Sequence, residues 1–277
     1  MVKFAIIGLG YISQRHLDAI HNNGGKLIMA CDIDKEKKQK VADDVLFFTD
    51  YKDMIKNPLF DKVDWVSICT PNYLHFQMIN DCFKNGKNIL SEKPLVIDSQ
   101  DLKDLEYIQN LAKDRKIYTV LQLRHNPEVE IFKDKFREGK YEGRMDIHLH
   151  RGEFYFEGWK GNENRSGGLL FNIGIHYFDL LLYLFGKPTN WGIGNKEKNY
   201  ADGRLVFNNV SIDWSLSIKA PMDNQIRKLK VGNEVLDLTR NFENLHNKVY
   251  EKVLNLEGFE IEEVGQVTKL LEEMKNA

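Results

Sequence analysis

The sequence predicts an α/β fold in two parts: a doubly wound parallel sheet in residues 1–121, and an α+β domain with an open, mainly antiparallel sheet in residues 122–277. Two periodicities carry this prediction. In the first part, short and continuous apolar runs alternate with stretches of helical spacing, which is typical of parallel strands covered on both faces by helices. In the second part, apolar and polar residues alternate along 145–149 and 212–218, as in half-buried antiparallel strands.

The elements of the first part follow from the apolar runs. Strands are expected at residues 3–7, 26–31, 45–48, 65–69, 88–90 and 117–121, and helices at 11–22, 34–43 and 99–114. In the first helix, Ile12, His16 and Ile20 recur at helical spacing, and the asparagines and glycines of 22–25 end it.

The second part combines strands with helices. Helices are expected at 127–138 and 169–185, and two short helices in 243–276 are expected to flank Gly258. Asn208-Asn209 and Gly232-Asn233 lie between apolar runs in the manner of two-residue hairpin turns. The second part is therefore predicted to be an antiparallel sheet with helices.

Composition excludes several classes of protein. Apolar residues make up 42% of the chain and the net charge is −2, so a disordered chain is not expected. The 39 basic residues face 41 acidic ones without a long basic block, so no nucleic-acid partner is expected. The sequence has no run of about 18 apolar residues, so no membrane span is predicted. Cys31, Cys69 and Cys82 lack Cys-x-x-Cys spacing, which favours buried, reduced thiols and a cytoplasmic location.

A glycine-rich turn joins the first strand to the first helix. In Gly8-x-Gly10-x-x-Ser13, the first glycine suits a tight turn and the second lets a pyrophosphate approach the backbone at the helix N-terminus. Ser13 replaces the usual third glycine or alanine, so the match is partial. Asp32 ends the second strand, where its carboxylate would accept hydrogen bonds from adenosine ribose hydroxyls and repel the 2′-phosphate of NADP. This pattern predicts a Rossmann domain that binds NAD.

Polar residues also follow two later strands. Thr70, Pro71 and Asn72 can position main-chain and amide groups near a cofactor, or they can start a helix with Thr70 or Asn72 as its cap. His75 is equally a site residue or a satisfied helix residue. Lys93, in Glu92-Lys93-Pro94, is placed for electrostatic work at a reacting oxygen. By residue physics alone, a solvated surface lysine is the favoured interpretation.

The helix at 169–185 carries the densest signal of the second part. Asn172, His176 and Asp179 are spaced i, i+4, i+7 and share one face of an otherwise apolar helix. The polar side chains of such a stripe must form hydrogen bonds with partners or line a cavity. Taken alone, a structural histidine bonded to Asp179 is slightly favoured. No metal site is predicted, since no second histidine or carboxylate cluster stands at ligand spacing.

Together these motifs resemble the Gfo/Idh/MocA family of NAD(P)-dependent sugar oxidoreductases. The resemblance rests on Gly8-Leu9-Gly10-Tyr11-Ile12, residues 69–75, Glu92-Lys93-Pro94-Leu95, and Gly167-Gly168 followed by residues 172–176. Residues 116–124, 159–161 and 165–168 further resemble the WlbA/WbpB group of UDP-N-acetyl-glucosaminuronate 3-dehydrogenases. Many family members carry Asp where this chain has Asn172, and Asn fits the narrower group.

The resemblance implies a reaction and its residues. The C3 hydroxyl of UDP-N-acetyl-glucosaminuronate would be oxidised to a ketone, in the synthesis of 2,3-diacetamido sugar acids for bacterial O-antigen. NAD would accept the hydride, His176 would be the base, Lys93 would stabilise the oxygen, and Asn172 would orient the substrate. The implied cofactor-binding residues are Gly8, Gly10, Tyr11, Ile12, Asp32, Thr70, Pro71, Asn72, His75, Glu92, Lys93 and Gln122.

The substrate carries a carboxylate and a diphosphate, so cations are expected around it. The candidate substrate-binding residues are Lys93, Arg124, Tyr155, Trp159, Lys160, Arg165, Asn172 and His176, with Arg151 behind them. The resemblance also implies 2-oxoglutarate as a possible hydride acceptor and a homodimer or homotetramer built on the open sheet. Two alternatives stay open: another sugar or cyclitol dehydrogenase, and a non-catalytic NAD-binding regulator. Retention of both Lys93 and His176 argues against the regulator.

Overall fold

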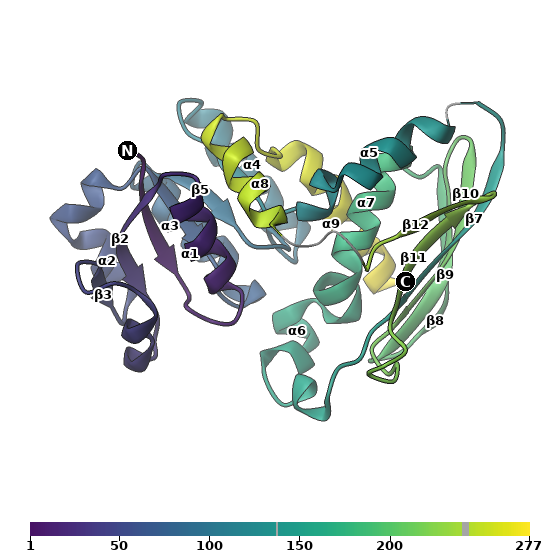
Figure 1. Ribbon diagram of the computed structural model, residues 1–277, viewed down its shortest axis with the longest axis horizontal. Helices are drawn as coiled ribbons and strands as arrows, with labels where there is room; N and C mark the ends of the chain where they lie inside the picture. The colour runs from purple at the N-terminus through teal and green to yellow at the C-terminus, as the bar shows by residue number, and fades with distance from the viewer. Residues whose placement is uncertain (137, 240–243) are drawn as a thin grey trace. The chain divides into compact units, whose positions relative to one another are not determined.

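The computed structural model describes residues 1–136, 138–239 and 244–277, with the main chain only at 153 and 154. The chain forms two compact units, which Figure 1 shows in sequence colours. Unit 1 contains Met1–Val120 and His246–Gly265, and unit 2 contains Leu121–Leu245 and Gln266–Ala277. The division differs from the predicted one, because a late segment of the chain returns to the first unit.

Unit 1 is built on a six-stranded parallel sheet. Its strands are β1 (Lys3–Ile7), β2 (Lys26–Cys31), β3 (Leu46–Phe48), β4 (Trp65–Ile68), β5 (Asn88–Ser91) and β6 (Ile117–Thr119), in the order β3-β2-β1-β4-β5-β6. This is the strand order of a dinucleotide-binding α/β sheet, with its switch point between β1 and β4. The predicted doubly wound sheet is confirmed.

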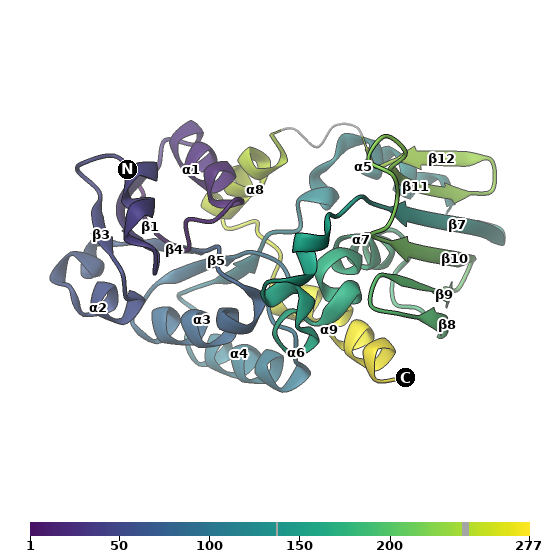
Figure 2. The same cartoon turned by 90° about the horizontal axis from the view of Figure 1, so that it is seen from below.

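Helices cover both faces of this sheet. In Figure 2, α1 (Ser13–Asn22) and α8 (Leu245–Leu254) lie on one face, and α3 (His75–Lys84) and α4 (Ser99–Leu111) lie on the other. A short helix, α2 (Tyr51–Lys56), follows β3. Residues 249, 250 and 253 of α8 join Phe4, Trp65 and Tyr118 in one buried cluster. This apolar stripe of α8 explains why residues 246–265 belong to unit 1.

The charged segment at 34–43 is not the predicted helix. The structure has a 3₁₀ helix over Lys35–Lys40, capped by the Asp34 carboxylate, which accepts the N–H of Glu36 at 3.0 Å. None of its residues is buried. An α-helix this short is marginal without an apolar face to pack, and this segment offers none.

Unit 2 is built on a mixed, mainly antiparallel sheet. Its strands are β7 (Tyr141–His148), β8 (Asn190–Lys196), β9 (Tyr200–Val206), β10 (Val210–Ser217), β11 (Ile226–Val231) and β12 (Glu234–Asp237), in the order β12-β11-β7-β10-β9-β8. Only the central pair, β7 with β10, is parallel among these pairs. The predicted hairpin turns at 208–209 and 232–233 fall between β9 and β10 and between β11 and β12.

One face of this sheet is covered by a long helical segment. The segment contains α6 (Glu163–Ser166), a π-helical turn (Leu170–Gly174) and α7 (Ile175–Phe185). Phe178 of α7 packs edge-on against Trp214 of β10, with ring centroids 5.0 Å apart. The π-helical turn interrupts the regular helix predicted at 169–185, and such turns often mark functional sites.

Two further helices lie wholly or partly in unit 2. They are α5 (Pro127–Lys133), followed by a 3₁₀ turn to Phe136, and α9 (Ile261–Asn276). Residues 137 and 243, which fall within two of the predicted helical stretches, lie outside the described residues.

By length and composition alone, the described residues include one helix, Glu163–Phe185, that would suffice to cross a membrane. Its apolar window is 72% buried inside the protein, as expected for a core helix. Asn172, His176 and Asp179 interrupt its apolar run, so the segment does not contain about 18 consecutive apolar residues. All three cysteines are free and buried, and burial raises the pKa of Cys31 to about 12.

Candidate functional site

The glycine turn after β1 has the geometry that a dinucleotide requires. Gly8 has φ +91°, and a Cβ at this position would lie 2.8 Å from the main chain of Cys69. Gly10 is exposed, with open space where a side chain would stand. Helix α1 starts without a side-chain cap, so the N–H groups of its first turn have no such partner. A bound pyrophosphate fits this cradle.

Ser13 and Asp32 stabilise the turn. The buried Ser13 hydroxyl donates to the Gly10 carbonyl at 2.7 Å, which gives the small third position a role of its own. The Asp32 carboxylate accepts the N–H of Leu9 at 2.7 Å and that of Asp34 at 2.9 Å. Each oxygen of Asp32 can accept one more hydrogen bond, from a ribose hydroxyl, since a carboxylate oxygen accepts two hydrogen bonds. Asp32, rather than Asp34, is therefore the carboxylate tied to the turn.

The loop after β4 is held by His75. Its side chain is fully buried, and its Nδ1 and Nε2 lie 2.7 Å and 2.9 Å from the main-chain oxygens of Pro94 and Thr70. Burial lowers the pKa of His75. The ring thus lies between the loop after β4 and the loop after β5 and, when neutral, donates its one N–H to one of these two oxygens. Its effect on a cofactor would be indirect. Neither Thr70 nor Asn72 caps the helical turn that begins here, which has Pro71 at its N-cap position.

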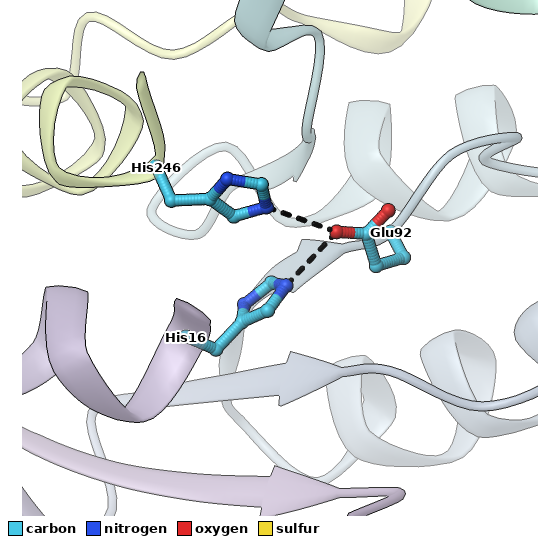
Figure 3. A group of neighbouring side chains, drawn as sticks. All are labelled: His16, Glu92 and His246. Carbon is cyan, nitrogen blue, oxygen red and sulfur yellow. Dashed lines mark hydrogen bonds and ion pairs between the residues drawn. The ribbon is translucent and has the colours of Figure 1, made fainter. Parts of the chain in front are cut away.

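Glu92 lies in a cluster that sequence reasoning missed. Its Oε1 is 3.0 Å from Nε2 of His16 and 3.4 Å from Nε2 of His246 (Figure 3). Glu92 is separated from these histidines by 76 and 154 positions along the chain, so no motif spacing connects the three. The available signal was His16 itself, a polar residue on the apolar stripe of the predicted first helix. The half-buried Lys93 follows at the end of the same strand.

In unit 2, the predicted polar stripe of the long helix divides into two parts. Asp179 forms a buried ion pair with Arg124, and Asn172 lies in the π-helical turn with 8% of its surface exposed. His176, at the start of α7, is half-buried. The ion pair engages the Arg124 guanidinium, so the substrate contact predicted for Arg124 would have to compete with a structural partner.

A pocket of about 370 Å³ in unit 2 brings together three predicted substrate residues, Tyr155, Lys160 and Asn172. The Tyr155 hydroxyl is buried and has no hydrogen-bond partner among the residues that the structure describes. Desolvation lowers the pKa of Lys160, and the charge of Arg151 lowers it further. The pocket also contains lysines that the sequence did not single out: Lys196, Lys198 and Lys275. The predicted residues Trp159 and Arg165 lie beside it in sequence and are not among its lining residues.

A hollow of about 440 Å³ lies on the outer face of the second sheet, among Arg144, Arg204 and Asp213. It contains none of the predicted site residues. Of the remaining predictions, Tyr11 is 90% exposed at the glycine turn and Ile12 is half-buried beside it. Gln122 lies near the start of unit 2, and its Oε1 is buried without a partner in the described part of the chain.

Family models match most of the chain. Residues 2–122 match the NAD-binding Rossmann fold of an oxidoreductase family, and residues 139–204 match the C-terminal alpha/beta domain of that family. The chain belongs to the Gfo/Idh/MocA oxidoreductase family. The resemblance inferred from its motifs and the predicted NAD-binding domain are both confirmed.

Solved structures of other dehydrogenases share the whole fold. The WlbA (WbpB) dehydrogenase from Thermus thermophilus, in complex with NAD and UDP-GlcNAcA, matches with TM-score 0.92 and 32% identity, covering 99% of this chain and 95% of that one. The same enzyme with NAD and alpha-ketoglutarate matches with TM-score 0.93 at the same identity and coverage. The WlbA dehydrogenase from Bordetella pertussis matches with TM-score 0.85 at 20% identity over 98% of this chain and 93% of that one, and so shows the fold alone.

Curated relatives are more distant in sequence. The inositol 2-dehydrogenase of Rubrobacter xylanophilus is 26% identical over 64% of this chain and 50% of its own length. The D-glucoside 3-dehydrogenase of Escherichia coli (strain K12) is 25% identical over 68% of this chain and 55% of its own length. The matched region thus spans about half the length of these relatives.

Proposed function

We propose that this protein is an NAD-dependent dehydrogenase that oxidises the C3 hydroxyl of UDP-N-acetyl-glucosaminuronate to a ketone. The observation that carries the proposal is the 32% identity, over 99% of the chain, to a dehydrogenase solved with NAD and UDP-GlcNAcA. The pocket of unit 2 supports it, because its four lysines outnumber its two glutamates, Glu163 and Glu197, and so offer net positive charge to an anionic sugar nucleotide.

In this mechanism the chain supplies a base, an oxygen-stabilising cation and an orienting amide. NAD, held at the glycine turn after β1, would supply the acceptor for the hydride of C3. His176 accepts the proton of the C3 hydroxyl, and the Lys93 ammonium stabilises the negative charge that develops on the oxygen. Asn172 orients the hydroxyl. The alcohol would thus lose a hydride to the cofactor and a proton to His176, and would become a ketone.

Further roles follow from the same assignment. The remaining predicted cofactor residues would surround the dinucleotide, with Asp32 on the adenosine ribose. 2-Oxoglutarate would accept the hydride of NADH and be reduced to the 2-hydroxy acid, in keeping with the alpha-ketoglutarate complex of the Thermus enzyme. The product would supply an aminotransferase in O-antigen synthesis. We place the protein in the cytoplasm as a homodimer or homotetramer.

A single-turnover assay tests the proposal. Stoichiometric purified protein is mixed with UDP-N-acetyl-glucosaminuronate and NAD, and the absorbance of reduced nicotinamide is followed. One equivalent of NADH is expected, and added 2-oxoglutarate is expected to remove it. Absence of reduction overturns the proposal. UDP-N-acetyl-glucosamine is the matched control, since it lacks only the carboxylate.

The curated relatives favour a second candidate function, oxidation of a free cyclitol or sugar. The inositol and glucoside dehydrogenases support it at 26% and 25% identity. The same assay, with myo-inositol and methyl glucoside as substrates, distinguishes this second function from the first. Reduction of NAD with these compounds, and none with the sugar nucleotide, would establish it.

A further inference from the structure

The cluster of His16, Glu92 and His246 joins three separate segments of unit 1. His16 comes from α1, Glu92 follows β5, and His246 lies in the first turn of α8 (Figure 3). Their exposed fractions are 0%, 7% and 5%. The imidazole rings of the two histidines meet edge to face, with centroids 5.3 Å apart. A carboxylate at this depth needs partners, because burial of an unpaired charge is costly.

Burial and hydrogen bonds together set the charges of Glu92 and His16. Burial raises the pKa of Glu92, but the hydrogen bonds from His16 and His246 outweigh burial and hold that pKa well below its usual range. Glu92 is therefore an anion that can only accept, and Nε2 of His16 must donate to it. Burial lowers the pKa of His16, so its ring is neutral and its Nδ1 is left to accept.

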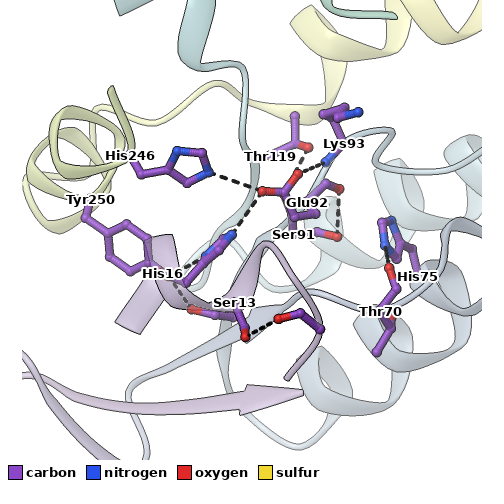
Figure 4. Close-up of polar contacts among 12 residues, drawn as sticks. Ser13, His16, Thr70, His75, Ser91, Glu92, Lys93, Thr119, His246 and Tyr250 are labelled. Atoms are coloured by element: carbon purple, nitrogen blue, oxygen red, sulfur yellow. Dashed lines mark hydrogen bonds and ion pairs between the residues drawn. The ribbon is translucent and has the colours of Figure 1, made fainter. Parts of the chain in front are cut away.

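The network continues away from Glu92 on the His16 side. Nδ1 of His16 is 2.8 Å from the Tyr250 hydroxyl (Figure 4). That hydroxyl is 2.6 Å from Oγ of Ser67. The tautomer fixed by Glu92 makes Tyr250 the donor to His16, and Ser67 then donates to Tyr250. Every hydrogen bond in the row therefore points toward the carboxylate.

The other side of the carboxylate faces the strand end. Oε2 of Glu92 accepts the main-chain N–H of Lys93 at 3.2 Å (Figure 4). One oxygen of Glu92 is thus held by α1 and α8, and the other holds the backbone of the residue that, in the proposed function, stabilises the reacting oxygen.

We propose that His16, Glu92 and His246 are positioning residues that fix the backbone at Lys93 and thereby place its ammonium. The proposal rests on the proposed function for the role of Lys93. A displacement of about 1 Å in a catalytic group can lower the rate about 100-fold. Holding the Lys93 backbone in place can therefore affect the rate more than the strength of these hydrogen bonds alone would suggest.

The same atoms could hold a divalent cation, because two imidazole nitrogens and one carboxylate oxygen lie within 4.8 Å of one another. The hydrogen-bond network already explains the position of these nitrogen and oxygen atoms. Both nitrogens of His16 and both oxygens of Glu92 have partners without an ion. The observations therefore favour the positioning role, and a metal is an outcome of the test.

The experiment compares His246→Leu with His246→Gln. Leucine removes the donor to Glu92, whereas glutamine can return an N–H close to the Nε2 position. We expect His246→Leu to lower kcat about 10- to 100-fold while the KM and Kd for NAD stay within about twofold, and His246→Gln to restore most of kcat. The matched control is His21→Gln, an exposed histidine on α1, which should change nothing. A proportional loss of NAD affinity and kcat in both His246 variants would indicate a merely structural role and overturn the proposal.

A second readout needs no substrate. Lysines are dimethylated with ¹³C-formaldehyde, and the Lys93 signal is assigned in NMR spectra with Lys93→Arg. The signal should move in His246→Leu and return in His246→Gln; an unmoved signal overturns the proposal even if the protein turns over no sugar nucleotide. Conversely, a moved signal without any turnover of the wild type contradicts the proposed function alone. Stoichiometric zinc in the purified protein, with kcat lost to a chelator and restored by Zn²⁺, would replace the positioning network by a metal site.

Discussion

Arg124 and Asp179 form a two-point ion pair inside unit 2. Nε of Arg124 donates to Oδ2 of Asp179 at 2.9 Å, and the Nη2 atom donates to Oδ1 at 2.6 Å. Their side chains are 3% and 2% exposed. The pair connects the turn at 122–125 to α7, the helix that begins next to His176. A residue predicted to face the substrate is thus bound to the helix that carries the predicted base.

Removing one partner of this pair should destabilise unit 2. Arg124→Leu or Asp179→Leu leaves a buried charge alone, which costs about 3–5 kcal/mol in the free energy of unfolding. The double variant should recover much of that loss, since an apolar pair of similar size replaces the ions. Urea denaturation measures all three. Single variants as stable as the wild type would contradict a structural ion pair.

Replacing Asp32 should weaken NAD binding. Asp32→Ala removes the acceptor of the Leu9 N–H and the proposed acceptor of the ribose hydroxyls, so the Kd for NAD should rise about tenfold or more. NADP should be less disfavoured, because the negative charge that repels its phosphate is gone. Fluorescence titration with both dinucleotides measures this. Asp34→Ala is the matched control, since the Asp34 carboxylate caps the 3₁₀ helix and pairs with Lys37, and the Leu9 N–H is held by Asp32. An unchanged preference in Asp32→Ala would place the ribose contact elsewhere.

Substitution of the proposed catalytic groups should separate chemistry from cofactor binding. Lys93→Ala and His176→Ala should each lower turnover about 10²- to 10⁴-fold, because each removes one positioned group. The Kd for NAD should change little. Near-normal turnover of His176→Ala in the single-turnover assay would show that another group takes the hydroxyl proton.

The pocket of unit 2 should bind the anionic parts of the substrate. Lys160→Ala should raise the KM for UDP-N-acetyl-glucosaminuronate about tenfold, by loss of a charged contact, and leave the Kd for NAD unchanged. Lys187→Ala, at an exposed position outside the pocket, serves as the control. Equal KM values for both variants in steady-state kinetics would remove Lys160 from the site.

Unit 1 should lose stability in acid. Burial lowers the pKa values of His16 and His75, and the histidine hydrogen bonds hold the pKa of Glu92 down against burial. In each case the unfolded chain binds protons more readily than the folded chain. Their stabilisation is therefore complete above about pH 6.5, the pKa of an unfolded histidine, and decreases as the pH falls toward the lowered values.

Urea denaturation between about pH 7.5 and about pH 5 checks this dependence. The free energy of unfolding should fall with decreasing pH, and His75→Gln should flatten the slope. His21→Gln, exposed on α1, should leave the slope unchanged. A slope in His75→Gln as steep as that of the wild type would mean that the buried ring does not carry the effect.

The elements of the fold that have a local sequence pattern could be predicted from the sequence. The alternation at 212–218 indicates one buried face of a strand, and the continuous apolar run at 3–7 indicates a strand buried on both faces. Gly8 indicates a turn that excludes a side chain. The partner of a buried polar group could not be predicted, because it depends on packing between distant segments. His246 reaches Glu92 from 154 positions away. The polar stripe likewise offered only His176 as a partner for Asp179, whereas Arg124 comes from a separate turn.

The placement of α8 has a consequence for synthesis. A nascent chain that ends near residue 120 contains all six strands of the first sheet, yet it exposes the apolar surface of Phe4, Trp65 and Tyr118 on which Tyr250 packs. It also leaves Glu92 with one of its two imidazoles. The ribosome must translate past residue 254 before α8 can cover this apolar surface of unit 1. We therefore expect an N-terminal fragment to aggregate or recruit chaperones, although it contains the entire nucleotide-binding motif.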